Sequence, residues 1–366
     1  MPSAQTQRWL ELCRSNHWST NQAGITRLED GRNAIPLNQN APESTDPCWE
    51  GNPQIELEVE KKRPVHWLDH LDRQLVEQHQ QHWPRSYEVQ GDVLIVKIEQ
   101  DVWDFGELIA DAMLTQLPNI RLVCADLGVK GEFRLRDLLP LASRDGSLHT
   151  RTRIRENGYM LWVDPSKVYF SARLSNERIE TLTSAQNLRQ ELGRPLVVCD
   201  PYAGVGPSMG ALLSEADLVG GYLVGDLNPD ATELLQTNID ALVSRRKSTG
   251  TAALAPTSVI CQDARRWAER EGNVGVVDML LVNLPHDSIA HLPSLLPLLR
   301  RDQTVVVKGW AIVQNTEQNS VEQAIRQAVI GQNGDVIHLA LREVKGFSMT
   351  KRFMSFEARC SFVSER

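Results

Sequence analysis

The sequence lacks the features that would place the protein in a membrane or in an oxidising compartment. None of its apolar runs approaches the roughly 18 residues that a membrane-spanning helix needs. The polar N-terminus, where Trp9 and Leu10 stand among charges, does not resemble a signal peptide. The six cysteines are scattered singly without a C-x-x-C pair, so neither a disulfide framework nor a zinc site is indicated. We therefore expect a cytoplasmic protein with reduced thiols.

An excess of positive charge is also lacking, because the formal net charge is −8 at pH 7. That value excludes an overall basic coat but not nucleic-acid binding, which depends on a local cluster of cations. Such a cluster, here called the basic segment, runs from Lys130 to Arg155 and contains seven cationic side chains against three acids. A solvated surface hairpin would explain the same residues equally well.

The segment Leu196–Asp240 has the pattern of a nucleotide-binding half of an α/β sheet. A short apolar run up to Cys199 predicts a fully buried strand. A turn with Gly204 and Gly206 follows, then a helix-like stretch, and then a second apolar run that ends on Asp226. Glycines let the backbone approach a ligand, and an acid at the second strand end can accept hydrogen bonds from ribose hydroxyls.

The turn also indicates which nucleotide is bound. Dinucleotide sites carry G-x-G-x-x-G, and here Met209 occupies the position of the third glycine. The turn opens on Asp200 and contains Pro207. Such an acidic turn suits a ligand with positive charge and no phosphate, such as S-adenosylmethionine. A tight turn without any ligand is the alternative, and the acid at position 226 disfavours it.

Four separated motifs carry a resemblance to one enzyme family. They are RENGYMLWVDPSKVYFSARLSNER at 155–178, DPYAGVGP at 200–207, GDLNPDATELLQTNID at 225–240 and LVNLPHDSIAHLP at 281–293. Together they resemble the tRNA (guanine-37-N1)-methyltransferases of archaea and eukaryotes, and the similarity runs from about Tyr87 to the C-terminus. The resemblance implies an α/β fold with the Rossmann-like seven-stranded sheet of class I methyltransferases, preceded by N-terminal α+β RNA-binding modules. It also implies S-adenosylmethionine as cofactor and tRNA as substrate.

Three domains are expected along the chain. Residues 1–83 would form a small N-terminal α+β module with a linker and a helix, residues 84–164 an α/β tRNA-gripping module, and residues 165–366 the S-adenosylmethionine-binding methyltransferase domain. In the first, the sequence predicts a helix at 6–18, a hairpin at 25–37, a linker at 38–54 and a helix at 63–83. In the others, it predicts strands at 93–98, 120–125, 258–262, 276–282 and 304–308, helices at 105–117 and 321–330, and hairpins at 151–163 and 336–362.

Two pairs of histidines on the expected helix at 63–83 raise the question of a metal site. His66 and His70 are four residues apart, and His79 and His82 are three apart. No cysteine or further acidic ligand follows at a useful spacing, so a polar helix surface is favoured and no metal is expected.

The reaction itself calls for two kinds of group. Guanine N1 carries a proton at neutral pH, so a carboxylate is needed to take it, and the charge that then spreads toward O6 needs a donor. By resemblance, Glu177 is the general base, with an ordinary helix charge as the alternative. The O6-stabilising arginine lies in Phe133-Arg134-Leu135-Arg136, where Arg136 is preferred over Arg134. Asn283 is expected to act beside them and to line the base pocket.

A larger set of residues is expected around the cofactor. Asp263, at the end of the third core strand, would accept from the adenine amino group, and Tyr169 would pack on the donor or on the flipped base. The cofactor-binding residues expected from the sequence are Tyr169, Asp200, Tyr202, Ala203, Gly204, Gly206, Asp226, Leu227, Asn228, Asp263, Ala264, Asn283 and Pro285.

Two other functions use the same features. An aminocarboxypropyl transferase of wybutosine synthesis would keep the fold and cofactor, but the Asn283-Leu284-Pro285 motif and the retained Glu177 weigh against it. A catalytically silent tRNA-binding protein would keep the basic segment and tolerate loss of Asp226 or Glu177. Under the leading hypothesis the protein is a monomer that binds tRNA and no membrane.

Overall fold

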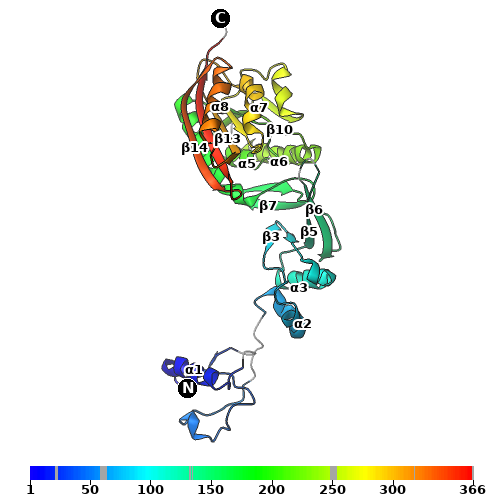
Figure 1. Cartoon of the computed structure of the whole chain (residues 1–366), viewed down its shortest axis with the longest axis vertical. Helices are drawn as coiled ribbons and strands as arrows, with labels where there is room; N and C mark the ends of the chain where they lie inside the picture. The colour runs from blue at the N-terminus through cyan, green and yellow to red at the C-terminus, as the bar shows by residue number, and fades with distance from the viewer. Residues whose placement is uncertain are drawn as a thin grey trace. The chain divides into compact units, whose positions relative to one another are not determined.

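The computed structural model describes residues 1–20, 24–57, 64–131, 133, 135–247, 254–316 and 318–364. The chain forms two compact units, Met1–Gln78 and His79–Arg366 (Figure 1).

The first unit contains the predicted helix and hairpin, while a longer helix expected at 63–83 is wrong. Helix α1 spans Thr6–Ser15, and strands β1 (Thr26–Arg27) and β2 (Asn33–Ala34) pair antiparallel. In place of the longer helix the structure has a 3-10 turn, η3 (Trp67–His70), and the short helix α2 (Arg73–Gln78). The extended conformation of the intervening Leu71 separates them. Residue 63 lies outside the described residues.

The segment expected to be a linker is part of the core of the first unit. Trp49 is the last residue of a short 3-10 turn, η2 (Pro47–Trp49), and is 5% exposed. Its ring stacks on Trp9 of α1 at a centroid distance of 6.1 Å and also contacts Trp18. Burying a tryptophan removes a large apolar surface from water, so the polar composition around it did not decide the outcome.

The second unit begins with a four-stranded sheet of order β3-β4-β5-β6. Its central strands β4 and β5 are parallel, the outer pairs are antiparallel, and helix α3 packs on β5 and β6. The elements are β3 (Tyr87–Gln90), β4 (Val93–Val96), the 3-10 helix η4 (Gln100–Phe105), α3 (Gly106–Gln116), β5 (Leu122–Lys130) and β6 (Leu135–Ser143). The strands and the helix predicted in this region are confirmed, with β5 longer than expected.

A seven-stranded sheet of order β11-β10-β9-β12-β13-β15-β14 follows (Figure 1). Strands β11, β10, β9, β12 and β13 run parallel, and β15 pairs antiparallel with both β13 and β14. The strands are β9 (Leu196–Asp200), β10 (Val219–Asp226), β11 (Thr257–Cys261), β12 (Met279–Val282), β13 (Thr304–Gln314), β14 (Gly334–Gly346) and β15 (Lys351–Phe362). This is the seven-stranded class I methyltransferase sheet that the sequence predicts.

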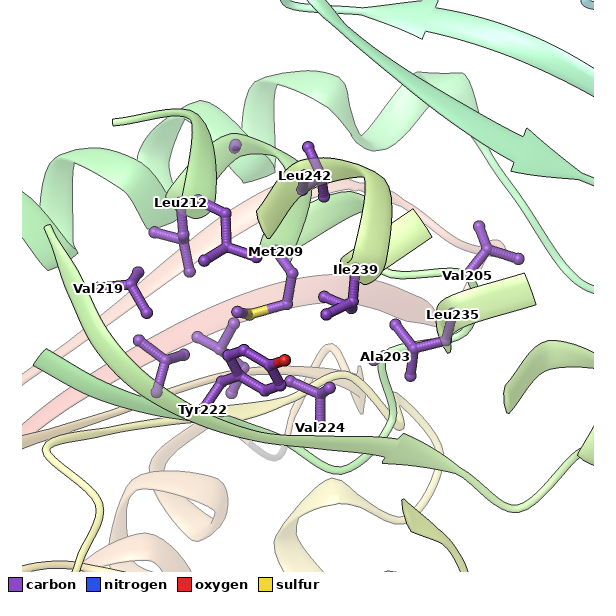
Figure 2. Close-up of a cluster of buried hydrophobic side chains, with 14 of the residues drawn as sticks. Ala203, Val205, Met209, Leu212, Val219, Tyr222, Val224, Leu235, Ile239 and Leu242 are labelled. Atoms are coloured by element: carbon purple, nitrogen blue, oxygen red, sulfur yellow. The ribbon is translucent and has the colours of Figure 1, made fainter. Parts of the chain in front are cut away.

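Helices cover both faces of this sheet, as a sheet buried on both sides requires. One face is covered by α4 (Ser175–Leu192), α5 (Pro207–Ser214) and α6 (Pro229–Lys247); their apolar side chains, among them Met209, Leu235 and Ile239, form one core (Figure 2). The other face is covered by η6 (Ala264–Glu269), α7 (Ser288–Leu295), η7 (Leu296–Leu298) and α8 (Gln318–Ile330).

A hairpin of β7 (Thr152–Glu156) and β8 (Tyr159–Val163) is fastened to the first of these faces. Asn238 of α6 accepts from the Trp162 N–H at 2.7 Å and donates to the Trp162 carbonyl at 3.0 Å. Arg178 of α4 forms a buried ion pair with Glu156 at 2.7 Å. The hairpin therefore packs on the helices of the seven-stranded sheet. A short 3-10 turn, η5 (Ala172–Leu174), leads from it into α4.

In the residues that the structure describes, no helix is both long and apolar enough to cross a membrane.

Candidate active site

Polar side chains stand at neighbouring strand ends on the carboxyl edge of the seven-stranded sheet. Asp200 ends β9, Asp226 ends β10 and Asn283 directly follows β12. The strand order reverses between β9 and β12, and open α/β sheets bind ligands at such a reversal. The fold thus brings three of the expected site residues to one place.

Glycine shapes the turn between β9 and α5. Gly204 and Gly206 both have positive φ, at 56° and 85°, a region that side chains disfavour. A methyl group on Gly206 would lie 2.6 Å from Cδ1 of the buried Leu235, so glycine is needed for α6 to pack here. The Gly204 N–H donates to Asp226 Oδ2 at 3.0 Å, and the Ala203 N–H donates to a carbonyl of β10 at 2.9 Å. The turn is therefore fixed to the neighbouring strand.

The two acids at these strand ends lack a cationic partner. Asp200 is 2% exposed, and burial raises its pKa to about 7 against the hydrogen bond from the Tyr202 N–H, with Asp226 adding to the rise. Burial also raises the pKa of Asp226, against hydrogen bonds from Asn228 and Gly204. Among the described residues, no cationic side chain lies within ion-pair distance of either carboxylate. A cationic ligand would favour the ionised form of both.

Asn228 uses its side chain inside the protein. Its Oδ1 accepts from the Asp230 N–H at 3.0 Å, and its Nδ2 donates to the Lys167 carbonyl at 2.8 Å. It therefore caps α6 and joins it to the segment that precedes Tyr169. The Asn228 side chain thus helps to hold this edge of the sheet in place.

Two exposed apolar side chains flank the glycine turn. Tyr169 is 65% exposed and Leu227 is 50% exposed. The Tyr169 carbonyl lies close to the turn, since a methyl group on Gly204 would approach it to 3.8 Å. The neighbouring Phe170 is instead buried, with the Arg178 guanidinium over its ring at 5.2 Å. Tyr169 is thus the aromatic residue available to a ligand.

Asp263 already has a partner. Arg265 Nη2 donates to Asp263 Oδ2 at 2.6 Å, and this hydrogen bond holds the pKa of the carboxyl below its usual range. Ala264, the next residue, is buried at the start of η6. An adenine amino group at Asp263 would have to share the carboxylate with Arg265 or displace it.

His291 is a residue of this region that the sequence did not single out. The Tyr202 hydroxyl and His291 Nδ1 lie 2.6 Å apart, and burial lowers the pKa of the histidine. The contact joins the glycine turn to α7. Its only signal in the sequence was its place inside the motif at 281–293.

The carboxylate of Glu177 lies at the same edge of the sheet, farther along the strand order. The residue stands in the first turn of α4 and is 5% exposed. Its Oε2 accepts from Trp310 Nε1 at 2.8 Å, and Arg342 Nη2 donates to Oε1 at 2.8 Å and to Oε2 at 3.0 Å. Trp310 directly follows the last residue of β13 that pairs with β12, so it is level with Asn283. Neither Trp310 nor Arg342 had a local signal in the sequence.

The loop after β12 places two expected residues. The Pro285 carbonyl accepts from the Ile312 N–H at 2.8 Å, which holds the loop against β13. Asn283 is half-buried, and its side chain forms no hydrogen bond with any residue in the described part of the chain. Its amide is therefore available to a bound base.

The arginine preferred from the sequence is paired with acids. Arg136 Nη2 donates to Glu88 Oε2 at 2.6 Å, and its Nη1 lies 3.9 Å from Asp126 Oδ2. Arg134, the second choice, lies outside the described residues. The structure thus shows Arg136 joining β6 to β3 and β5, and not paired with the Glu177 carboxylate.

The rest of the basic segment divides into bound and available cations. Lys130 pairs with an acid of β6, and Arg144 donates to backbone carbonyls. Arg151 and Arg153 instead lie over the Trp162 ring at 5.0 and 5.1 Å. We call Arg151, Arg153, Arg155 and Trp162, which lie together on the β7–β8 hairpin and its entry, the arginine face.

One histidine meets acids that lie far from it in the sequence. His82 Nδ1 is 3.1 Å from Glu99 Oε2 and 3.6 Å from Asp101 Oδ2. These three atoms could approach one cation, contrary to the expectation that no acid lies near the histidines. All three side chains are substantially exposed, and exposed acids commonly gather without an ion, so we assign no metal.

The sheet order and the acidic glycine turn together define the fold as that of a class I methyltransferase. Residues 152–328 match the TRM5/TYW2 methyltransferase domain, and residues 68–146 match the TYW2 N-terminal domain. The chain therefore carries a TRM5/TYW2 methyltransferase domain.

Curated relatives carry one name repeatedly. The tRNA (guanine(37)-N(1))-methyltransferase Trm5b of Pyrococcus abyssi is 32% identical over 187 residues, which are 51% of this chain and 52% of that protein. Trm5b of Methanocaldococcus jannaschii is 38% identical over 155 residues, 42% of each chain. The chain therefore spans about half the length of the curated relatives it matches.

Solved structures share the fold over a longer stretch. The crystal structure of Pyrococcus abyssi Trm5b has a TM-score of 0.65 at 23% identity and covers 99% of this chain and 98% of its own. Pyrococcus horikoshii TYW2 in complex with MeSAdo has a TM-score of 0.61 at 18% identity and covers 81% and 96%. At these identities the likeness concerns the fold alone.

Proposed function

We propose that the protein transfers a methyl group from S-adenosylmethionine to N1 of guanine 37 in tRNA. The observation that carries the proposal is the Glu177 carboxylate, whose donor Trp310 is level with Asn283 at the sheet edge where Asp200 and Asp226 also end their strands. Relatives named tRNA (guanine(37)-N(1))-methyltransferase support the choice of acceptor.

The residues at the glycine turn fit S-adenosylmethionine. Two acids without a cationic partner suit its sulfonium and ammonium, the turn leaves no room for a side chain at Gly206, and Tyr169 offers an exposed ring. When bound, the cofactor supplies a methyl group on a positively charged sulfur. We assign to its site Tyr169, Asp200, Tyr202, Ala203, Gly204, Gly206, Asp226, Leu227, Asn228, Asp263, Ala264, Asn283 and Pro285.

Glu177 is the residue that we assign to proton transfer. Its carboxylate takes the proton from guanine N1, and the electron pair of the N1–H bond stays on the ring, where it makes N1 nucleophilic. Asn283 can hold the edge of the base through its amide. We retain Arg136 and Arg134 as candidates for the O6 donor; Arg136 would first have to leave Glu88.

The tRNA would lie against the arginine face. Its arginines lie on the β7–β8 hairpin. The Arg178–Glu156 ion pair joins this hairpin to α4, the helix that carries Glu177. Guanidinium groups bind phosphates, and an aromatic ring between them can stack on a base. Guanine 37 would have to leave the anticodon stack, at a cost of a few kcal/mol. We further propose that the enzyme is a cytoplasmic monomer.

A second function, that of an aminocarboxypropyl transferase, is also supported by the comparisons. Residues 68–146 match the TYW2 N-terminal domain, and the fold is shared with Pyrococcus horikoshii TYW2. An aminocarboxypropyl transferase of wybutosine synthesis therefore remains the alternative enzyme, and a silent tRNA-binding protein the alternative without chemistry.

One experiment separates these functions. The protein is incubated with unmodified tRNA transcript and labelled S-adenosylmethionine, and the nucleosides are identified by mass after digestion. One methyl group on guanine supports the proposal, a larger adduct supports the alternative transferase, and no product supports the silent protein. A transcript with adenine at position 37 is the control and should give no product. Product from this transcript would mean that the enzyme modifies a base other than guanine 37.

A further inference from the structure

A row of three residues crosses the antiparallel end of the sheet beneath Glu177. Trp310 of β13 pairs with Ser355 of β15, and Ser355 pairs with Arg342 of β14. Residues directly opposite in antiparallel strands point to the same face. Trp310 and Arg342 therefore both reach α4, with the small, buried Ser355 between them.

The hydrogen bonds from Trp310 and Arg342 leave one acceptor position of the Glu177 carboxylate unused. An ionised carboxylate offers about four lone-pair positions on its two oxygens. Glu177 Oε2 accepts two donors, Trp310 Nε1 and Arg342 Nη2, while Oε1 accepts from Arg342 Nη2 alone among the residues that the structure describes. The remaining acceptor position is therefore on Oε1.

Arg342 is also the ion-pair partner of Glu177, a carboxylate that is buried away from water. Glu177 is 5% exposed, whereas the Arg342 side chain is about half exposed, at 48%. Among the described residues, no other cation lies within ion-pair distance of Glu177; the next residue, Arg178, is engaged with Glu156. A buried carboxylate that loses such a partner is left as an uncompensated charge away from water.

We propose that Arg342 is a positioning residue for the reaction: it is the charge partner of the buried Glu177 carboxylate and, together with Trp310, turns Oε1 toward the proton to be removed. This rests on the proposed function of Glu177. The proton passes from guanine N1 to Glu177 Oε1, and the N1–H electron pair stays on the ring. Arg342 donates throughout and does not touch the base.

A second ion pair supplies a matched control. Arg359 of β15 pairs with Glu191 near the other end of α4, so it ties the same helix to the same end of the sheet. Glu191 is 43% exposed, and neither residue of this pair belongs to the proposed site. Removing Arg359 tests what a simple tether contributes.

The experiment compares R342Q, R342K and R359Q with the wild-type enzyme. Single-turnover methylation of the transcript is measured, with the KM for tRNA, the Kd for S-adenosylmethionine and the melting temperature. R342Q should lower the methylation rate by about 10- to 100-fold, because displacing a catalytic group by about 1 Å can slow a reaction by about 10²-fold. The Kd for S-adenosylmethionine should change little. R342K should regain part of the rate, since it restores the charge without the guanidinium geometry.

The control fixes how the outcomes are interpreted. R359Q should change the melting temperature but leave the rate at its wild-type value. If R342Q merely destabilises the protein as R359Q does, with its rate unchanged, Arg342 is a tether and the inference is wrong. If the wild-type enzyme forms no methylguanosine, the proposed function fails and takes this role with it, a result distinct from the first.

Discussion

Asp226 and Gly204, 22 residues apart, are joined by a hydrogen bond from the Gly204 N–H to Asp226 Oδ2 at 3.0 Å. The end of β10 therefore holds the glycine turn in place through the protein's own hydrogen bond. A site whose backbone is already ordered loses less conformational freedom on binding. The same carboxylate keeps further lone pairs for ribose hydroxyls, so its structural and binding roles are compatible.

Replacing Asp226 tests the ribose assignment. D226A removes a charged acceptor and frees the glycine turn, so S-adenosylmethionine should bind about 10- to 100-fold more weakly by calorimetry. D230A is the control, because Asp230, in the first turn of the following helix α6, forms an exposed pair with Lys167, and such pairs contribute little. Equal affinities for D226A and D230A would mean that the ribose lies elsewhere.

Cofactor binding should depend on pH through Asp200. Its pKa of about 7 leaves much of the carboxyl protonated in mild acid, and a cationic ligand prefers the ionised form. The affinity for S-adenosylmethionine should therefore rise between about pH 5.5 and 7.5. D200N should bind more weakly and show no such rise when both proteins are titrated at constant ionic strength.

The folding stability of the protein without cofactor should depend on pH in the opposite direction. Because the pKa of Asp200 is raised in the folded state, its contribution to stability is present in acid and is lost as the pH rises through about 7. Thermal unfolding should show D200N gaining on the wild-type protein as the pH increases. A difference between the two proteins that stays constant with pH would count against the raised pKa.

Gly206 should tolerate no side chain. G206A combines a positive φ, which costs a side chain about 1–2 kcal/mol, with a contact of 2.6 Å to Leu235. G193A is matched, since Gly193 also has positive φ, at the end of α4, but an added methyl group there meets nothing within 4 Å. Chemical denaturation should show the larger loss for G206A, and only that variant should lose affinity for S-adenosylmethionine. Equal losses would mean that the contact relaxes freely.

Glu177 should act on turnover and not on cofactor binding. E177Q keeps the size of the side chain but removes its basicity, so the methylation rate should fall by about 10²- to 10⁴-fold while the Kd for S-adenosylmethionine stays near normal. E180Q, at an exposed position one turn away on α4, is the control. An unchanged rate in E177Q would eliminate this residue as the base.

The arginine face should contribute to tRNA affinity and its salt dependence. R153A should weaken tRNA binding at every sequence tested and reduce the slope of log K against log salt by about 1. R266A removes an arginine on the other face of the sheet, where it pairs with Glu269, and should leave both unchanged. Filter binding at several salt concentrations gives both quantities, and an unchanged slope for R153A would place the tRNA elsewhere.

Local patterns determined the central half of the sheet. The strand before Asp200, the glycine turn and the strand ending on Asp226 follow from apolar runs and glycines within a few dozen residues, and the structure confirms them. Their relative placement was predictable too, because parallel strands joined by helices bring their carboxyl ends to one edge. Local composition failed where a single large side chain decided the outcome, as with Trp49 in the expected linker.

The partners of the charged groups depended on the tertiary structure. Glu177 meets Trp310 and Arg342, which are 133 and 165 residues away, because the register of β13, β15 and β14 places them in one row on the same face of the sheet. Arg136 meets Glu88 for the same kind of reason, across a sheet whose register the sequence did not reveal. The sequence by itself determined the class of sheet and the edge at which a ligand binds, since periodicity and turn chemistry are local. Which side chains pair across that edge was decided only by the fold, since strand register is a property of the whole core.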